Sequence, residues 1–303
     1  MARITDTALR RAREFIWLTG TALDQHRMAV FTGTGSPEAA RAALDAHRTE
    51  DGGFAFAVEP DVKGPDPQPL SAMSALEILD EIGTFDQPTA WSVCDWLQRH
   101  SAGDGGVPDL LPTIGRYPRP PWVEPPPQDR GGLLTTARIV GLLRRHGVDH
   151  PWVEGATAFC REAIGGLEST HPYEVLSINV FLDHHPDRTW SRAASKRIGE
   201  LVRDTRLVLL DPANPEDLPT PPGYAEEEFT FACAFAPSPH SLAAEWFSDA
   251  EMRLSLDHLA SEQREDGGWP IHYLKWHPAI EQQARPGFTL AALKTLRAWD
   301  QSF

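Results

Sequence analysis

Cysteine is scarce in this sequence. The 303 residues include three cysteines, Cys94, Cys160 and Cys233, and no two of them have the C-x-x-C spacing. An odd number of isolated cysteines argues against a disulfide framework and is typical of a reducing compartment. A G-x-x-x-x-G-K-[ST] phosphate loop, a G-x-S-x-G elbow and an H-E-x-x-H helix are also absent. His272 and His277 lack metal-ligand spacing and a clear third ligand, so we predict neither a metal site nor a cofactor.

Long apolar runs and an excess of basic residues are missing too. No stretch approaches the roughly 18 apolar residues of a membrane span, and the first residues lack the basic-then-apolar pattern of a signal peptide. Lysine and arginine number 28 against 43 aspartates and glutamates, which gives a net charge of -15. This charge repels nucleic acid and anionic membranes. We therefore expect a cytoplasmic protein that neither inserts into a membrane nor binds nucleic acid.

What the sequence does contain is a repeat. The tripeptide Asp-Gly-Gly occurs at 51–53, 104–106 and 266–268, each time after a helical-looking stretch and before a loop with proline or glycine. An apolar helix follows each loop, and the spacing of about 46 to 60 residues is typical of a helical pair. Glycine permits positive φ at a helix C-terminus and aspartate bonds local amides, so we interpret the tripeptide as an architectural turn.

Two sets of helices are predicted to alternate along the chain. Prolines and capping residues mark an amphipathic outer set at about 37–48, 88–100, 151–164, 189–204 and 249–263. A more apolar inner set is expected at about 69–83, 132–146, 172–185, 226–236 and 287–300, with residues 6–32 as a sixth member. The period-two alternation within 226–236 also fits a strand, but its place in the series favours a helix.

This alternation predicts the fold class. Both sets of helices bury their apolar faces when a ring of inner helices stands inside a ring of outer ones. We therefore predict an all-α fold, an α/α toroid with about six inner and five to six outer helices. Residues 1–303 are expected to form it as a single domain. Ten tryptophans and a hydrophobic content of 41% supply a large core and an aromatic-lined cavity.

One copy of the repeat resembles a known family. Residues 263–269, Gln-Arg-Glu-Asp-Gly-Gly-Trp, match the Q-x-x-D-G-G-W repeat of squalene-hopene cyclases and other terpenoid cyclases. The helix-loop-helix spacing over about 37–300 also resembles the β subunits of protein prenyltransferases. The resemblance implies a toroid that encloses a hydrophobic small molecule. The D-x-D-D motif of class II cyclases and the D-x-C zinc motif of prenyltransferases are both absent, so neither parental chemistry transfers.

Loop lengths indicate where a site would lie. Connections from inner to outer helices are short, whereas residues 54–69, 107–131 and 270–286 form long connections from outer to inner helices. The long loops therefore gather at the end that holds the N-termini of the inner helices. Functional residues tend to lie on loops that a rigid scaffold positions, so this end is the predicted functional end.

Three residues of these loops are the catalytic candidates. Glu59 and Asp61 are two carboxylates held close together by a proline, and they act as a general acid and its partner if they share one proton. His272 is a candidate proton shuttle near neutral pH. The alternative for the two acids is a solvated turn or a helix cap.

Aromatic and histidine side chains near the same loops are the substrate-binding candidates, because aromatic faces stack on apolar or cationic ligands. They are Trp269, Trp276, His171, Tyr173, Trp122 and Tyr117. The alternatives are packing of these rings under the loops and, for His171, capping of a helix. Trp122 and Tyr117 belong to a stretch with eight prolines, 108–127, which reads as a stiff cover or a docking strip.

Three functions remain open. The first is a terpenoid-cyclase-like cyclase, lyase or isomerase that acts on a hydrophobic small molecule by acid–base chemistry. The second is a carbohydrate lyase or hydrolase on an α/α barrel, and the third is a non-catalytic repeat scaffold that binds a protein. Apolar inner helices would favour the first function, and Asn, Arg, Asp and Gln at the centre would favour the second.

Overall fold

The structure is all-helical. The computed structural model describes residues 4–215, 218, 220–221, 224–225 and 228–300. Within these ranges the extended pairing is limited to two isolated bridges, between Arg48 and Phe54 and between Leu209 and Phe231. The predicted all-α fold class is therefore confirmed.

The helices follow one another in pairs. Their bounds are α1 (Asp6–Thr19), α2 (Ala22–Phe31), α3 (Pro37–Asp45), α4 (Pro69–Glu81), α5 (Gln87–His100), α6 (Leu133–Arg145), α7 (Pro151–Gly166), α8 (Pro172–His184), α9 (Arg188–Asp204), α10 (Ala232–Phe235), α11 (Asp249–Ser261) and α12 (Pro278–Asp300). Two short 3-10 helices, η1 (Pro112–Arg116) and η2 (Leu242–Trp246), lie in the connections.

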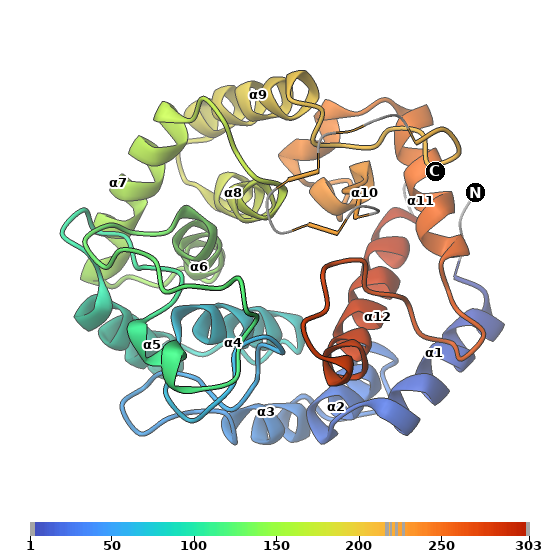
Figure 1. The fold of residues 1–303 in the computed structure, drawn as a ribbon, viewed down its shortest axis with the longest axis horizontal. Coiled ribbons are helices and arrows are strands. Elements are labelled where there is room, and N and C mark those ends of the chain that lie inside the picture. The colour runs from blue at the N-terminus through green and yellow to red at the C-terminus, as the bar shows by residue number, and fades with distance from the viewer. Residues whose placement is uncertain (1–3, 216–217, 219, 222–223, 226–227, 301–303) are drawn as a thin grey trace.

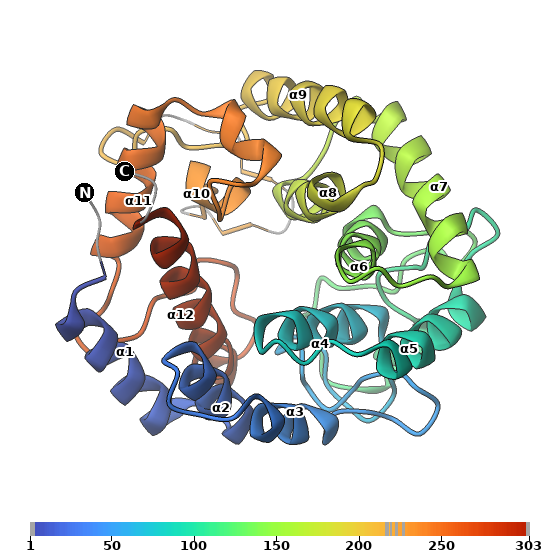
Figure 2. The ribbon, with the colours of Figure 1, turned by 180° about the vertical axis from the view of Figure 1, so that it is seen from behind.

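The pairs are arranged in a circle. Figure 1 shows α4, α6, α8, α10 and α12 toward the middle, with α1, α3, α5, α7, α9 and α11 around the outside. Helix α12 contacts α1, α2 and α11, so the last repeat packs on the first. The reverse view in Figure 2 shows the same order. The main hydrophobic core draws buried side chains from both sets, including Trp96 of α5 and Phe181 of α8.

Most helices begin where capping chemistry predicts. Proline occupies the first helical position of α3, α4, α7 and α8, where its missing N–H costs no hydrogen bond. The side chains of Ser36, Asp86, Asp187 and Ser248 accept hydrogen bonds from the first-turn amides of α3, α5, α9 and α11. The predicted starts of these outer helices therefore fall within one residue of the observed ones.

Three predicted inner segments differ from the structure. Residues 6–32 form two helices, because the chain is extended at Gly20 and Thr21 and a capping box between Thr21 and Asp24 starts α2. Only Ala232–Phe235 is helical within 226–236, of which 226–227 lie outside the described residues. The segment predicted at 287–300 begins earlier, at Pro278, and Pro286 lies inside α12 without ending it.

The Asp-Gly-Gly turns join neighbouring outer helices. In each copy the aspartate accepts the amide N–H two residues later, at 3.3, 3.0 and 3.0 Å. The first glycine has a positive φ of 98°, 90° and 94° in the three copies. Each of these glycines lies against the backbone of the next outer helix, namely Gly52 on Ser92 of α5, Gly105 on Gly155 of α7 and Gly267 on Arg11 of α1. The tripeptide therefore acts as an architectural element, as its chemistry predicts.

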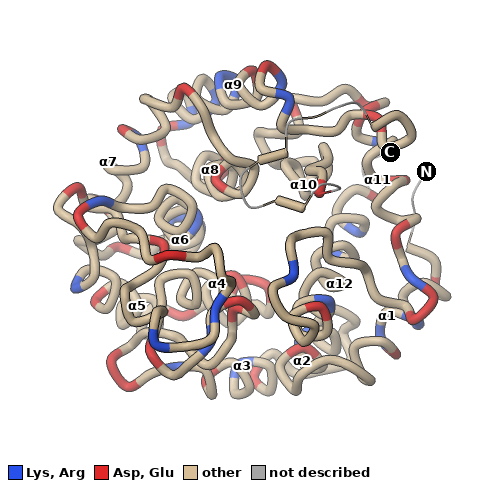
Figure 3. The backbone as a smooth tube through the Cα atoms, viewed as in Figure 1, with Lys and Arg blue, Asp and Glu red and all other residues tan. Residues whose placement is uncertain are grey.

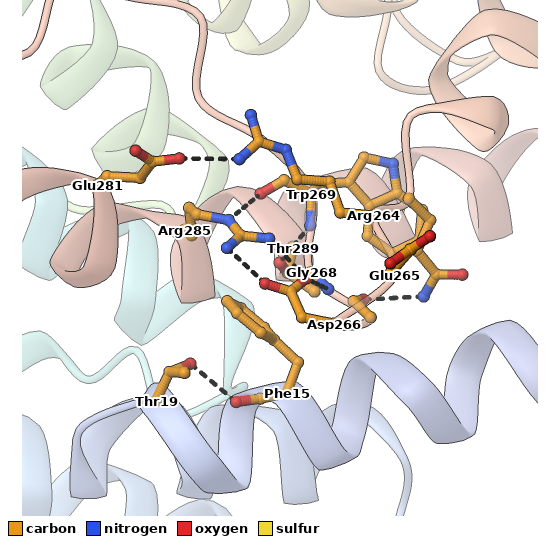
Figure 4. A network of polar contacts seen from close by, with 12 residues as sticks. Phe15, Thr19, Arg264, Glu265, Asp266, Gly268, Trp269, Glu281, Arg285 and Thr289 are labelled. Carbon is orange, nitrogen blue, oxygen red and sulfur yellow. Dashed lines mark hydrogen bonds and ion pairs between the residues drawn. The ribbon is translucent and has the colours of Figure 1, made fainter.

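The third turn connects the end of the circle to its beginning (Figure 4). Arg11 of α1 donates to the carbonyl oxygens of Arg264 and Glu265, at 2.9 and 2.6 Å. Asp266 accepts two hydrogen bonds from Arg285 of α12, at 2.7 and 2.8 Å. The Arg285 guanidinium also lies 4.5 Å above the Phe15 ring of α1, so this one turn holds α11, α12 and α1 together.

Candidate functional site

The long loops lie on one face of the circle, which is nearer the viewer in Figure 1, and the short turns lie on the face that Figure 2 shows in front. This arrangement brings together residues that are far apart in the sequence. Glu59 and Asp61 come from the loop before α4, and Tyr273 and Trp276 come from the loop before α12. Tyr173 lies in the first turn of α8.

Glu59 and Asp61 form the first part of the site, and both are partly buried. One carboxylate oxygen of Glu59 accepts a hydrogen bond from the hydroxyl of Ser74 in α4, at 3.0 Å. Burial, together with the negative charge of Asp61, raises the pKa of Glu59 to about 7. Glu59 is therefore able both to give and to accept a proton near neutral pH, which is the property that a general acid–base group needs.

Asp61 connects the first long loop to the last. The indole N–H of Trp276 donates to Asp61 Oδ1 at 2.8 Å, although the two residues are 215 positions apart. Burial raises the pKa of Asp61, while the Trp276 hydrogen bond and the charge of Lys63 act in the opposite direction. The ammonium of Lys63 donates to Gln283 of α12 at 2.5 Å, which ties the same two segments together a second time.

A further carboxylate, Glu228, lies beside the first turn of α8. Its side chain is 8% exposed and accepts hydrogen bonds from the Tyr173 hydroxyl at 2.6 Å and the Ala225 amide at 3.0 Å. Burial raises the pKa of Glu228 above its usual range. The rings of His171, Tyr173 and Tyr224 contact one another with centroids 5.0 to 5.2 Å apart. His171 also caps α8 by accepting a hydrogen bond from the Tyr173 amide N–H. Helix capping is the alternative role that the sequence offers for this residue.

Tyr273 interacts electrostatically with both groups of carboxylates. Burial raises the pKa of its phenol, and the charges of Asp61, Glu59 and Glu228 raise it further. Its ring lies 5.8 Å from that of Phe288 in α12. We name the whole set the acid–aromatic cluster, and its members are Glu59, Asp61, Glu228, Tyr173, Tyr273 and Trp276.

His272 lies at the edge of the acid–aromatic cluster. Its side chain is 43% exposed, and Nε2 lies 2.5 Å from a carboxylate oxygen of Glu262. This hydrogen bond raises the pKa of His272, with a smaller contribution from the charge of Glu228. His272 therefore holds its proton more firmly than a free imidazole does, which suits a proton donor better than a proton acceptor.

The other aromatic candidates lie outside the cluster. Trp269 is 3% exposed and donates its indole N–H to the Leu259 carbonyl at 2.7 Å, so its ring packs in the core and presents no free face to a ligand. The ring of Tyr117 packs on Gly64 of the first long loop. Trp122 is 45% exposed. The stretch that contains these two residues packs on the first loop through Val62, Leu110 and Ile114, as a cover would.

Sequence reasoning did not identify Glu228, Tyr224 or Ser74 as members of a site. Glu228 and Tyr224 belong to the connection between α9 and α10, which carries no motif and was expected to become helical from residue 226. Ser74 is one of several small residues on an apolar helix, and only the fold shows that it lies below Glu59. The acidic run that ends at Glu228 was the one available signal.

Below the acid–aromatic cluster, the inner helices are joined by charged and polar side chains. Arg138 of α6 forms an ion pair with Glu77 of α4 and donates to Ser177 of α8 at 3.2 Å. The outer faces of these helices are covered by α5, α7 and α9 (Figure 3), and the Arg138 and Glu77 side chains remain 21% and 36% exposed. Polar side chains therefore join the inner helices to one another, which purely apolar helices would not do.

Two further features concern the residues that the structure describes: clusters of metal-ligating side chains and helices that could span a membrane. No group of three or more His, Cys, Asp and Glu side chains there is arranged to hold a metal ion. The helices described are also too short or too polar to cross a membrane.

The Trp276–Asp61 hydrogen bond leads to a testable expectation. Trp276→Phe removes the N–H donor and keeps an aromatic ring, so the ionised form of Asp61 loses a partner while its burial persists. We expect the pKa of Asp61 to rise and the free energy of unfolding to fall by about 1 kcal/mol. Carbon-13 NMR of the aspartate carboxyl groups measures the first change and urea unfolding the second. Trp122→Phe, at an exposed position, is the control and should change neither.

Comparison with known proteins supports the fold. No protein-family model and no curated protein sequence matches the chain. Among solved structures, a crystal structure of a protein from Actinoplanes is similar, with a TM-score of 0.58 and 19% sequence identity over 96% of this chain and 98% of that chain. This likeness shows a shared fold along nearly the whole chain.

Proposed function

We propose that the protein is an enzyme that carries out acid–base chemistry on a small molecule bound at the acid–aromatic cluster. The observation that supports this most strongly is the Glu59–Asp61 pair, in which burial and mutual repulsion keep Glu59 near a pKa of about 7. In this proposal Glu59 transfers the proton. Asp61, held by Trp276, remains the charged partner that stabilises positive charge on the reacting molecule.

Polar side chains around the site favour a hydroxylated substrate, such as a carbohydrate, and a lyase or hydrolase reaction. Tyr173 and Tyr273 offer hydroxyl groups, Trp276 offers an aromatic surface beside Asp61, and the inner helices carry Glu77 and Arg138. Aromatic platforms next to paired carboxyl groups suit the recognition and cleavage of sugars. In this proposal the lyase or hydrolase reaction proceeds by proton transfer and needs no metal and no cofactor.

A terpenoid-cyclase-like reaction is the second candidate. Phe288 of α12 is 44% exposed and lies beside Tyr273, so the cluster also has an apolar part that would accept a hydrophobic chain. The repeat at 263–269 supports kinship with the terpenoid cyclase and prenyltransferase superfamily. The class of reaction would then be a cyclisation, elimination or isomerisation in which Glu59 protonates or deprotonates carbon.

A substrate panel with one catalytic variant tests both candidates. We expect product from either oligosaccharides or polyprenyl diphosphates, and Glu59→Gln should lower kcat/KM by about 100-fold or more because a general acid contributes about 10²–10⁴-fold. Glu50→Gln, at an exposed position before the first turn, is the matched control and should keep full activity. Full activity in Glu59→Gln, or no product from either panel, would contradict the proposal.

A further inference from the structure

Glu59 rests on a face of α4 that continues into a second charged group. Ser74, which donates to Glu59 at 3.0 Å, and Glu77 are three positions apart in α4. Residues at this spacing are neighbours on the same face of a helix. Glu77 therefore lies one turn below the residue that holds Glu59.

Arg138 fixes Glu77 in that position. Its guanidinium pairs with Glu77, and its Nε donates to Ser177 Oγ at 3.2 Å, so one side chain of α6 contacts both α4 and α8. A guanidinium anchored at two points loses little freedom per hydrogen bond, because its planar fork is preorganised. The Glu77–Arg138 pair is thus a fixed pair of charges beneath the Glu59 carboxyl group.

Several elements bring charge to Glu59, and their signs differ. Its own loop contributes Asp61 and Lys63, α4 contributes Glu77, and the last long loop contributes the neutral phenol of Tyr273. A negative Glu77 disfavours the ionised form of Glu59, while the positive charge of Arg138, which pairs with Glu77, acts in the opposite direction. The pair of opposite charges therefore acts on Glu59 less strongly than the charge of Glu77 alone would.

We propose that the Glu77–Arg138 pair is a positioning element of the site, through which Arg138 keeps Glu59 able to exchange a proton near neutral pH. This inference rests on the proposed role of Glu59 as the acid–base group. It assigns to Glu77 and Arg138 a function beyond joining α4 to α6, namely the control of how much of Glu59 is protonated at the working pH.

Titration of Glu59 in the full-length protein tests the proposal without an activity assay. Carbon-13 labelling of glutamate carboxyl groups follows each titration, and Glu59→Gln identifies the Glu59 signal. We expect Arg138→Gln to raise the Glu59 pKa by about 0.5–1 unit, because Glu77 then loses its ion-pair partner and the positive charge that offsets it. Glu77→Gln should lower it by a similar amount, and the double variant, which loses both charges, should titrate close to the natural protein.

Two further variants separate an electrostatic role from a structural one. Arg138→Lys keeps the positive charge and should leave the Glu59 titration close to that of the natural protein. Arg192→Gln removes an exposed arginine of α9 that pairs with Glu245 and should leave it unchanged. If Arg138→Gln does not fold, the titrations of Glu77→Gln and Arg138→Lys still show whether the charges of the pair control the Glu59 pKa.

An unchanged Glu59 titration in both Glu77→Gln and Arg138→Gln would overturn the inference and leave the pair a structural tie. If the proposed function is wrong but the Glu77–Arg138 pair does act on Glu59, the experiments give a different pattern. In that case the titration shifts occur as expected, but Glu59→Gln keeps the activity of the natural protein.

Discussion

Gly267→Ala is expected to lower the free energy of unfolding by about 3 kcal/mol or more, from left-handed strain and steric overlap together. Gly267 has a φ of 94°, a conformation that side chains disfavour. A Cβ atom at this position would also lie within 2.5 Å of the Arg11 carbonyl carbon in α1. Because that obstacle is backbone, relief requires α1 to move away from the turn, and the contacts of Arg11 with Arg264 and Glu265 would be lost with it.

Gly287→Ala provides the matched control. Gly287 lies inside α12, and an added Cβ would have nothing within 4 Å. Alanine replaces glycine in a helix with a gain of about 0.5–1 kcal/mol, so this variant should be as stable as the natural protein or more so. Urea unfolding followed by circular dichroism measures both variants. Equal stability of Gly267→Ala and Gly287→Ala would show that the turn does not depend on the glycine.

Glu81→Gln is expected to destabilise the protein by about 3 kcal/mol, as the loss of one partner does in other buried ion pairs. Glu81 ends α4, and its side chain is 12% exposed. It accepts hydrogen bonds from Arg27 of α2 at 2.7 and 3.0 Å and from Lys294 of α12 at 3.1 Å. The variant leaves the buried guanidinium of Arg27 with Asp24, at 3.4 Å, as an ion-pair partner.

The same carboxylate makes stability depend on pH. Burial acts to raise the pKa of Glu81, but the charges and hydrogen bonds of Arg27 and Lys294 outweigh it and hold the pKa at about 2. Because the folded pKa lies below the unfolded one, the contribution of Glu81 is complete above about pH 5 and is lost as the pH falls toward 2. A depression of this size corresponds to about 3 kcal/mol.

Unfolding of both proteins at pH 7 and at pH 2.5 checks this expectation. The difference in unfolding free energy between the natural protein and Glu81→Gln should be largest at pH 7 and small at pH 2.5. Glu200→Gln removes an exposed carboxylate of α9 that lies 3.9 Å from Lys196 and should cost less than about 0.5 kcal/mol at either pH. A constant difference for Glu81→Gln across the pH range would contradict the assigned role.

Local chemistry explains which parts of the fold were predictable from the sequence. Helix starts were predictable, because prolines and capping side chains act on the residues next to them, as Ser36 does for α3 and Asp187 for α9. The ends and interruptions were harder. Pro286 does not end α12, and the segment before α10 is extended, because contacts with distant residues such as the Leu209–Phe231 bridge outweigh local preference there.

The candidate site was predictable where its members are neighbours in the sequence. Glu59 and Asp61 are two positions apart, so their mutual repulsion followed from the sequence. The aromatic ring of Trp276 makes it a binding candidate from sequence alone, but its hydrogen bond to Asp61 depends on how two loops cross. The burial of Trp269 does not follow from its local sequence, because a tryptophan beside a turn and one buried under it look alike there. Its hydrogen bond to the Leu259 carbonyl and its 3% exposure distinguish the two.

The contact between Arg11 and the turn at Gly267 has a consequence during synthesis of the chain. A ribosome adds about 5–20 residues per second, so α1 emerges about 12 to 50 seconds before its partner turn exists. Throughout that interval Ala12, Phe15 and Ile16, which are buried in the finished protein, lack part of their cover. Nascent chains stopped before residue 266 should therefore bind chaperones through α1, and release should follow once residues 263–268 have left the exit tunnel.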